Sequence, residues 1–381
     1  MPGNSGTISD WMNMKKLILL LFIAIQILSA PVPKGTRYYI PIVIHHEYVA
    51  ADRNHFLYQL NMTGIMLSDD IFRSNIASVN NILIYDSSNN VVRDKYAQID
   101  VDNGYLVISW DAPATTAYDR IFYACVGAGI NDANKSSTFS SNDYDHEWPI
   151  KEFSPDAQTD DVVGTYDMIV ESNASIGHDG YFGKCATNTG VDGKIWMDNI
   201  VLPATITKSI EFLIYVDGYG NGGLGRIIQA WPCVIYVWSG AGENLRFTND
   251  GFTDIINHPL SFHEWHHVII VRTDVGGVYI YVDGNSSPGY SGGATANNEG
   301  FIVLNDYNEA FAFDGMISDI GIINGASALT YAQSRSNMLM APNDFRTFGD
   351  GVYVNGNGYM SGMTWWPDYN RSYHRWNVGF R

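Results

Sequence analysis

The chain of 381 residues has little cysteine, little positive charge and few long apolar runs. Its three cysteines, Cys125, Cys185 and Cys233, are too few and too odd in number for a disulfide framework. Cys185 and Cys233 are predicted to share a domain and can pair if the chain is exported. Three buried free thiols are the alternative.

Positive charge is scarce, because 22 Lys and Arg stand against 40 Asp and Glu, for a formal net charge of −18. Such a field repels nucleic acids and anionic membrane surfaces. Neutral glycans, and divalent cations held by carboxylates, remain compatible with it. We therefore expect no nucleic-acid partner.

The sequence also lacks long amphipathic helical patterns and is rich in glycine (37), tyrosine (24) and tryptophan (10). Short runs of β-branched and aromatic residues alternate with turn residues, as in 38–44, 81–86, 105–110, 120–126, 210–216, 265–273 and 278–283. This spacing favours an all-β fold of sandwiches or jelly rolls over alternating strands and helices.

One apolar run, Leu17–Leu28, follows Met14-Lys15-Lys16 and precedes Ser29-Ala30. A charged start, a short apolar core and a small residue are typical of a signal peptide, and the run is short for a membrane span. Residues 1–30 are therefore predicted to be a signal peptide, or else a hydrophobic N-terminal segment that docks or anchors. The first reading places the protein outside the cell or on its surface.

Composition divides the rest of the chain. Residues 31–130 are predicted to form an N-terminal β-sandwich, 131–164 an Asn-, Ser- and Asp-rich linker, and 165–340 a second sandwich. Residues 341–381 form a tail dense in aromatics, which must bury them on the chain itself or on a neighbouring subunit. We lean to the neighbouring subunit, which predicts homo-oligomer or filament contacts.

The stretch 261–333 contains Trp265-His266-His267-Val268, the turn Asp283-Gly284, then Phe313-Asp314-Gly315 and Ala328-Leu329-Thr330. These motifs resemble the laminin G-like, concanavalin A-type lectin and glucanase fold. The resemblance implies a jelly roll in 165–340. The first region, through Tyr85-Asp86 and Trp110-x-x-Pro113, is similar to an uncharacterised β-sandwich domain found in front of such lectin-like domains.

Two catalytic motifs are present in the sequence, but the residues around them do not predict the structure that each needs. His263-Glu264-Trp265-His266-His267 matches the spacing of a zinc protease, but that chemistry needs a helix. The β-branched run after it predicts a strand, which would hold the two histidines about 13 Å apart. Alternation along this strand should place Trp265, Ile269 and Val271 on one face and Val268 and Ile270 on the other, with Trp265 and Ile269 in the core. Gly218–Gly223 matches a dinucleotide loop, yet the residues that follow favour a strand over the required helix.

A glucanase needs paired acids about 5 Å apart, whereas Glu211, Glu243 and Glu264 are isolated in the sequence. We therefore predict a protein that is not an enzyme. The first hypothesis is a secreted or surface protein that binds glycans or cell-surface partners. The alternative is a structural subunit of a surface assembly, such as a virion fibre, a decoration protein or a filament. A glycoside hydrolase comes last.

Two sets of candidate site residues follow from these readings. Lectin-like domains often bind calcium at the rim of the sandwich, and Asp217, Asn221, Asn249 and Asp250 are oxygen donors in predicted turns. Turn residues chosen for local hydrogen bonds are the simpler interpretation of the same four. The loop with Trp365, Trp366 and Tyr369 is the candidate surface for stacking on sugar rings. No cofactor other than such calcium is expected.

Overall fold

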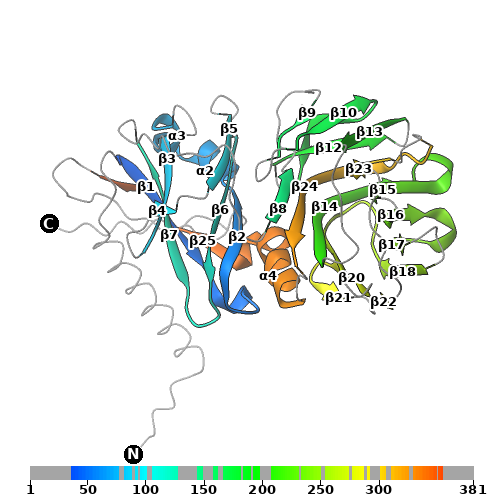
Figure 1. Ribbon diagram of the computed structural model, residues 1–381. Helices are drawn as coiled ribbons and strands as arrows, with labels where there is room; N and C mark the ends of the chain where they lie inside the picture. Colours follow the sequence, from blue (N-terminus) through cyan, green and yellow to red (C-terminus); the bar gives the residue numbers. More distant parts are fainter. Residues whose placement is uncertain are drawn as a thin grey trace, which may run out of the picture.

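The computed structural model describes the following residues: 36–76, 81–87, 91–92, 95–100, 105–127, 144–148, 158–161, 166–181, 183–189, 192–197, 207–230, 233–249, 254–273, 277–286, 290–291, 301–305, 310–325, 329–349 and 351–354. They form four antiparallel sheets stacked side by side (Figure 1). The predicted all-β fold of two tandem sandwiches is confirmed. Among these residues, no helix is long and apolar enough to cross a bilayer.

The first sandwich has one sheet in the order β25-β1-β7-β3-β4, with β26 also on β1, and a second in the order β2-β6-β5. Its strands are β1 (Tyr38–Ile44), β2 (Arg53–Asn61), β3 (Ile82–Asp86), β4 (Val91–Val92), β5 (Lys95–Asp100), β6 (Tyr105–Ala114), β7 (Arg120–Val126), β25 (Arg346–Phe348) and β26 (Val352–Tyr353).

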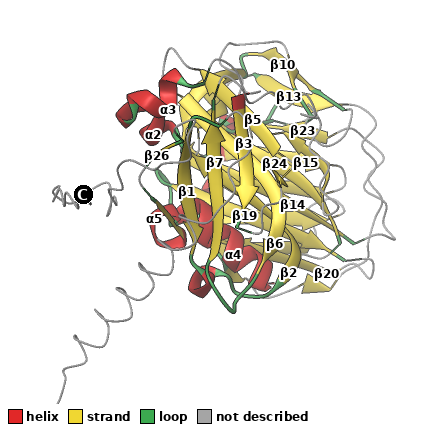
Figure 2. Cartoon of the chain, turned by 90° about the vertical axis from the view of Figure 1, so that its left-hand side faces the viewer, coloured by secondary structure: helices red, strands yellow, loops and turns green. Residues whose placement is uncertain are grey.

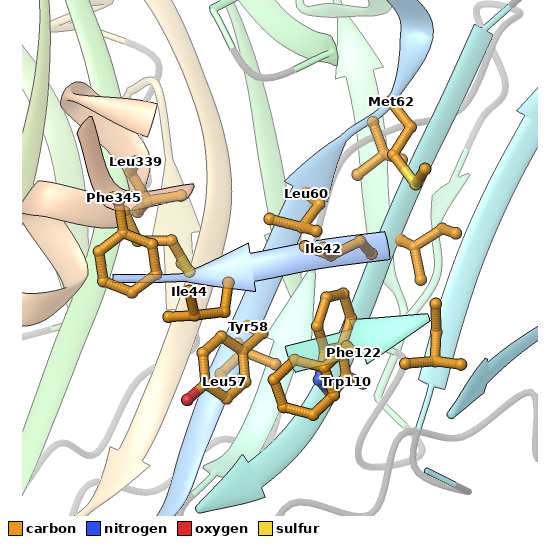
Figure 3. Close-up of a cluster of buried hydrophobic side chains, with 14 of the residues drawn as sticks. Ile42, Ile44, Leu57, Tyr58, Leu60, Met62, Trp110, Phe122, Leu339 and Phe345 are labelled. Atoms are coloured by element: carbon orange, nitrogen blue, oxygen red, sulfur yellow. The ribbon is translucent and has the colours of Figure 1, made fainter. Parts of the chain in front are cut away.

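Aromatic rings fill the core between these two sheets. Trp110 of β6 stacks on Tyr58 of β2 with ring centroids 5.4 Å apart, and Phe122 of β7 packs edge-on at 5.2 Å (Figure 3). Strand β1 alternates, so that Ile40, Ile42 and Ile44 point into this core while Tyr39 and Val43 join a smaller cluster on the outer face.

The second sandwich has one sheet in the order β18-β17-β16-β15-β23-β13-β10-β9 and a facing sheet in the order β11-β12-β24-β14-β19-β20-β21, with β22 and β8 added at its sides. Its strands are β8 (Tyr144–Trp148), β9 (Gln158–Thr159), β10 (Met168–Ser172), β11 (Ser175–Gly180), β12 (Gly183–Thr189), β13 (Gly193–Met197), β14 (Lys208–Gly218), β15 (Leu224–Ala230), β16 (Cys233–Trp238), β17 (Asn244–Asn249), β18 (Asp254–Pro259), β19 (Trp265–Arg272), β20 (Gly277–Val282), β21 (Asn285–Ser286), β22 (Tyr290–Ser291), β23 (Phe301–Val303) and β24 (Asp314–Asn324).

Helices are few and short in the described part of the chain. They are η1 (His46–Tyr48), α2 (Thr63–Ser68), α3 (Asp70–Ser74), η3 (Asn221–Gly223), η4 (Ser239–Ala241), α4 (Leu329–Met340) and α5 (Pro342–Phe345). In Figure 2 the α-helices gather along one side of the stacked sheets, with α2 and α3 above and α4 and α5 below. Helix α4 lies between the two sandwiches (Figure 1).

The two sandwiches share a core. Ile269 and Val271 of β19 belong to the same buried cluster as Leu57 of β2 and Leu339 of α4. We call this contact between the sandwiches the seam. The alternation predicted for β19 is confirmed, because Val268 and Ile270 point the other way, into the core of the second sandwich.

Trp265 requires a correction to its expected place in the core. It is only half-buried and packs against the seam, with its ring 5.8 Å from that of Tyr215. The reason is that Trp265 is the first residue of β19 and lies at the end of the sheet, where it pairs with Tyr215 of β14. The three cysteines Cys125, Cys185 and Cys233 are all buried free thiols.

The predicted linker 131–164 and tail 341–381 contain short strands where they are described. Tyr144–Trp148 form β8, which pairs antiparallel with β24 of the second sandwich. Arg346–Phe348 form β25, which pairs antiparallel with β1 of the first. β25 covers the side of β1 that faces away from β7, and β8 covers the part of β24, Ile320–Ile323, that β12 does not reach. Residues 1–30 lie outside the described part of the chain.

Candidate functional site at the rim of the second sandwich

A cavity of about 390 Å³ opens at one end of the second sandwich. We call it the rim pocket; its lining residues are Glu243, His258, Pro259, Leu260, Ser261, His266, Val282, Asp283 and Asn285. They come from the end of β18, the loop that leads into β19, the turn between β20 and β21, and the residue before β17. The pocket therefore lies where the two sheets of this sandwich part.

Residues in the left-handed backbone conformation shape two walls of this pocket. Asp283 and Gly284 have φ values of 50° and 75°, as a two-residue hairpin turn with both central residues left-handed requires. The predicted turn at Asp283-Gly284 is thus confirmed. On the other wall, His263 has a φ of 63°, and its N–H donates to the carbonyl of Val216 at 2.9 Å. Such left-handed non-glycine residues persist only where their surroundings hold them.

His266 is the central polar group of the pocket and is largely buried. Its Nδ1 lies 2.6 Å from Asp283 Oδ2, and its Nε2 lies 3.0 Å from the carbonyl oxygen of Ser261. Both partners accept hydrogen bonds, so the geometry suits an imidazolium that donates from both nitrogens.

Electrostatics agree with that protonation state. Burial opposes the charged form of His266, but the hydrogen bond and charge of Asp283, the Ser261 carbonyl and the charge of Glu264 outweigh burial. Together they raise the pKa of His266 above its ordinary value. The cation is therefore matched by carboxylates on the pocket wall.

Ser261, His266 and Asp283 are the residue types of a serine-hydrolase triad, and the histidine lies between the other two. The distance from Ser261 Oγ to His266 Nε2 is 3.4 Å. The hydrogen bonds do not fit that chemistry. His266 Nε2 donates to the Ser261 carbonyl, and the Ser261 hydroxyl donates to the carboxylate of Glu264. No lone pair of the imidazole faces the hydroxyl, so the serine is not activated here.

Three further polar residues, His258, Glu243 and Asn285, line the pocket. His258 bridges two carbonyls, that of Pro259 at 2.8 Å and that of Asn285 at 3.2 Å. Glu243 and Asn285 are exposed, and the Glu243 carboxylate forms no ion pair with the described residues. The pocket thus combines fixed polar walls with an exposed carboxylate that has no ion-pair partner among the described residues.

No family model and no curated protein matches the chain. Similar solved structures include the binding domain of Paraclostridial Mosquitocidal Protein 1, at 16% identity and a TM-score of 0.42 over 51% of this chain and 52% of that one. Others are the binding domain of botulinum neurotoxin serotype D (12%, TM-score 0.40, 51% of each chain) and the receptor binding domain of botulinum neurotoxin type G (13%, TM-score 0.39, 52% and 51%). The chain spans about half the length of these structures. A likeness of this degree transfers no ligand or residue role.

Three of the four predicted calcium donors lie in the described part of the chain, and these three do not form one cluster. Asp217, the next-to-last residue of β14, has its carboxylate 3.1 Å from His263 Nδ1, and Asn221 is exposed in η3. Asn249 is the last residue of β17, whose first residue is on the pocket side. Five residues of strand put it about 17 Å away. Asp250 lies outside the described residues.

The rim near Asp217 has a second carboxylate that the sequence reading missed. Asp314 pairs in register with Gly218, and burial, followed by the charge of Asp217, raises the pKa of Asp314. Within the described ranges, no group of three or more His, Cys, Asp or Glu residues is placed to hold a metal. The predicted stacking residues Trp365, Trp366 and Tyr369 lie outside the described part of the chain.

The residues of the rim pocket were named in the sequence only as parts of other patterns. His266 belonged to a discounted zinc motif and Asp283 to a hairpin turn. Their spacing of 17 residues carries no signal of its own. The usable signal was the pair of apolar runs 265–273 and 278–283, because as adjacent antiparallel strands β19 and β20 they return Asp283 to the start of β19, beside His266.

Proposed function

We propose that this protein is a non-catalytic binding protein of the cell exterior, which recognises a hydroxyl-rich ligand, a surface glycan, in the rim pocket. The observation that carries the proposal is a cavity of about 390 Å³ in which His266 and His258 are held by hydrogen bonds and the exposed Glu243 carboxylate has no ion-pair partner among the described residues. Sugar hydroxyls both donate and accept hydrogen bonds, so the polar groups on the pocket walls suit a hydroxylated ligand that carries no charge.

The hydrogen-bond pattern supports binding over catalysis. The His266 imidazole donates from both nitrogens, and the Ser261 hydroxyl is committed to Glu264. A hydrolase would need a base with a free lone pair at this point. The resemblance of the motifs in 261–333 to lectin-like domains is in keeping with a glycan as the ligand.

Charge and the N-terminal sequence support the place and the kind of partner. A net charge of −18, with Glu243, Glu264 and Asp283 around the pocket, disfavours anionic ligands. The apolar run Leu17–Leu28 after Lys15-Lys16 supports export, and mass spectrometry of the mature N-terminus would test it.

The experiment is binding of the full chain to an array of neutral and acidic oligosaccharides at pH 7. We expect neutral glycans to bind, and the double variant Glu243→Ala/Asn285→Ala to lose at least tenfold in affinity. Asp179→Ala is the matched control, since Asp179 is an exposed carboxylate in the hairpin of β11 and β12, away from the pocket.

Two results would overturn the proposal. The first is an array on which no neutral glycan binds above background, or on which the pocket variant binds like the wild type. The second is cleavage of the ligand, because the proposal expects bound oligosaccharides to be recovered intact after long incubation. Cleavage by the wild type that Ser261→Ala or Glu243→Ala abolishes would make the protein a hydrolase.

A further inference from the structure

Trp238, the last residue of β16, presents a large apolar side chain to solvent beside the rim pocket. It is 43% exposed, while the other aromatic of the same strand, Tyr236, is only 2% exposed. Residues 235 and 237 of β16 point into the core, so Trp238 stands on the outer face of its sheet. A tryptophan exposed on an ordered strand offers an aromatic surface on which a ligand can stack.

Its neighbours hold the indole in one place. The guanidinium carbon of Arg246 lies 5.0 Å from the Trp238 ring centroid, and Arg246 Nε donates to Asn257 Oδ1 at 2.7 Å. On the ring edge, helix η4 comes so close that a Cβ on Gly240 would lie 2.6 Å from an indole carbon. We call Trp238, Arg246 and Asn257 the Trp238 platform. Its rigidity lowers the entropy cost of binding a guest.

The platform and the rim pocket are joined by a short, fixed loop. Residues 239–243 run from Trp238 to Glu243, which lines the pocket. The Asn244 side-chain amide donates to the Ala241 carbonyl at 2.6 Å, and the Leu260 N–H donates to the Glu243 carbonyl at 3.1 Å. The loop is therefore tied to both sides, and the two surfaces keep a constant spacing.

Strand β18 also connects them. Asn257 belongs to the platform, and the next residue, His258, lines the pocket. Neighbouring residues of a strand point to opposite faces, so β18, at the edge of its sheet, separates the two surfaces by one strand's thickness. A ligand that crosses this edge touches both.

We propose that the rim pocket and the Trp238 platform are two subsites for one neutral glycan of at least two sugar rings. One ring stacks on Trp238, and the hydroxyls of a following ring bond to Glu243 and Asn285 in the pocket. Aromatic faces suit the apolar side of a sugar ring, while the carboxylates exclude acidic sugars. This inference rests on the proposed function and extends it from a single ring to a chain.

The experiment measures affinity against chain length by calorimetry. The probes are series of one to four rings built from glucose, galactose or N-acetylglucosamine, each titrated into the full chain. We expect at least a tenfold gain in affinity from one ring to three in the series that binds. Trp238→Ala should remove this gain and leave the single-ring affinity within twofold. Trp238→Phe, which keeps an aromatic face, should restore most of it.

The outcomes separate the two proposals. If Glu243→Ala weakens binding of every chain length and Trp238→Ala changes none, the platform is not a subsite and the pocket remains one. If no series binds, or if both variants bind like the wild type, both proposals fail. Light scattering checks a third case: a dimer that Trp238→Ala dissociates would assign the platform to a second copy of the chain and overturn this inference.

Discussion

Two neighbouring histidines on β19, His266 and His267, have nearly the same partners and opposite surroundings. His266 lies between Asp283 and Ser261 at the rim, and His267 lies between Glu211 and Ser336 in the seam. Each set is a serine, a histidine and a carboxylate. Alternation along the strand sends one set toward solvent and the other between the sandwiches.

The seam set is closed. Glu211 Oε1 accepts from His267 Nε2 and from Arg335 Nε, both at 2.7 Å, and Arg335 Nη1 donates to the carbonyl of Leu57 at 2.7 Å. His267, Glu211 and Arg335 are each 1–2% exposed. The network ties β14, β19, α4 and β2 together and is closed to solvent. Access, and not residue type, separates this buried network from the binding site that we propose at the rim.

The largest expected effect comes from opening the seam network. Glu211→Ala would leave the buried Arg335 and His267 without their shared carboxylate, so we expect the free energy of unfolding to fall by about 3–5 kcal/mol. Urea denaturation followed by tryptophan fluorescence measures it.

The matched control for the seam is Glu264→Ala at the rim, where the carboxylate is exposed and 3.8 Å from His266. Its loss should cost less than about 1 kcal/mol. Equal losses in the two variants would break the distinction between a closed seam and an open rim.

The apolar part of the seam should contribute almost as much. Ile269→Ala removes a fully buried side chain from the cluster shared by both sandwiches, and we expect a loss of about 3 kcal/mol. Tyr279→Ala on the neighbouring strand β20 is the control, because Tyr279 is 41% exposed. If Ile269→Ala costs no more than Tyr279→Ala, the sandwiches do not depend on a common core.

The sequence predicted this strand better than it predicted its neighbours. The continuous apolar run Val268–Val271 identifies β19 as a strand that is buried on both faces. Once the strand is identified, alternation assigns its residues to the two faces. In contrast, β8 and β25 are short, and β8 is Tyr-Asp-His-Glu-Trp, so nothing in their local pattern identifies a strand. Their pairing with β24 and β1 joins segments far apart in the sequence, which composition cannot reveal.

The site was predicted least well, for a related reason. Asp283 reaches His266 through a hairpin that the sequence does indicate, but Ser261 reaches it through a loop whose path depends on the left-handed His263. Histidine rarely adopts that conformation, and no local pattern encodes it. The predicted donor Asn249 failed to join Asp217 because the length of β17 lies between them.

At the rim, the pairing of His266 with Asp283 should make the free energy of unfolding depend on pH. The folded pKa of His266 is raised above the ordinary value of 6.5, so its pairing with Asp283 stabilises the fold fully below pH 6.5. That stabilisation is lost as the pH rises through the raised pKa. We expect Asp283→Asn to lose about 1–2 kcal/mol at pH 6.

The loss in Asp283→Asn should shrink as the pH rises through the raised pKa of His266, because deprotonation removes the positive partner of the Asp283 carboxylate. Denaturation curves at pH 6, 7.5 and 9 measure this difference, and a constant gap at all three values would contradict it. Asn keeps the oxygen that accepts from the His267 N–H at 2.9 Å, so this bond gives no pH-dependent contribution.

The smallest expected change in stability is the most informative about function. Glu243 is exposed, and its carboxylate is unpaired among the described residues, so Glu243→Gln should change the free energy of unfolding by less than about 0.5 kcal/mol. The same variant keeps the size of the side chain and loses only a charged acceptor on the pocket wall. It should therefore weaken binding of neutral oligosaccharides severalfold while its denaturation curve overlays that of the wild type. In the seam, by comparison, Glu211→Gln keeps the side-chain size but loses the charge between Arg335 and His267, and it should be clearly destabilised. A stable Glu211→Gln, or a Glu243→Gln that unfolds early, would reverse the roles assigned to the two sites.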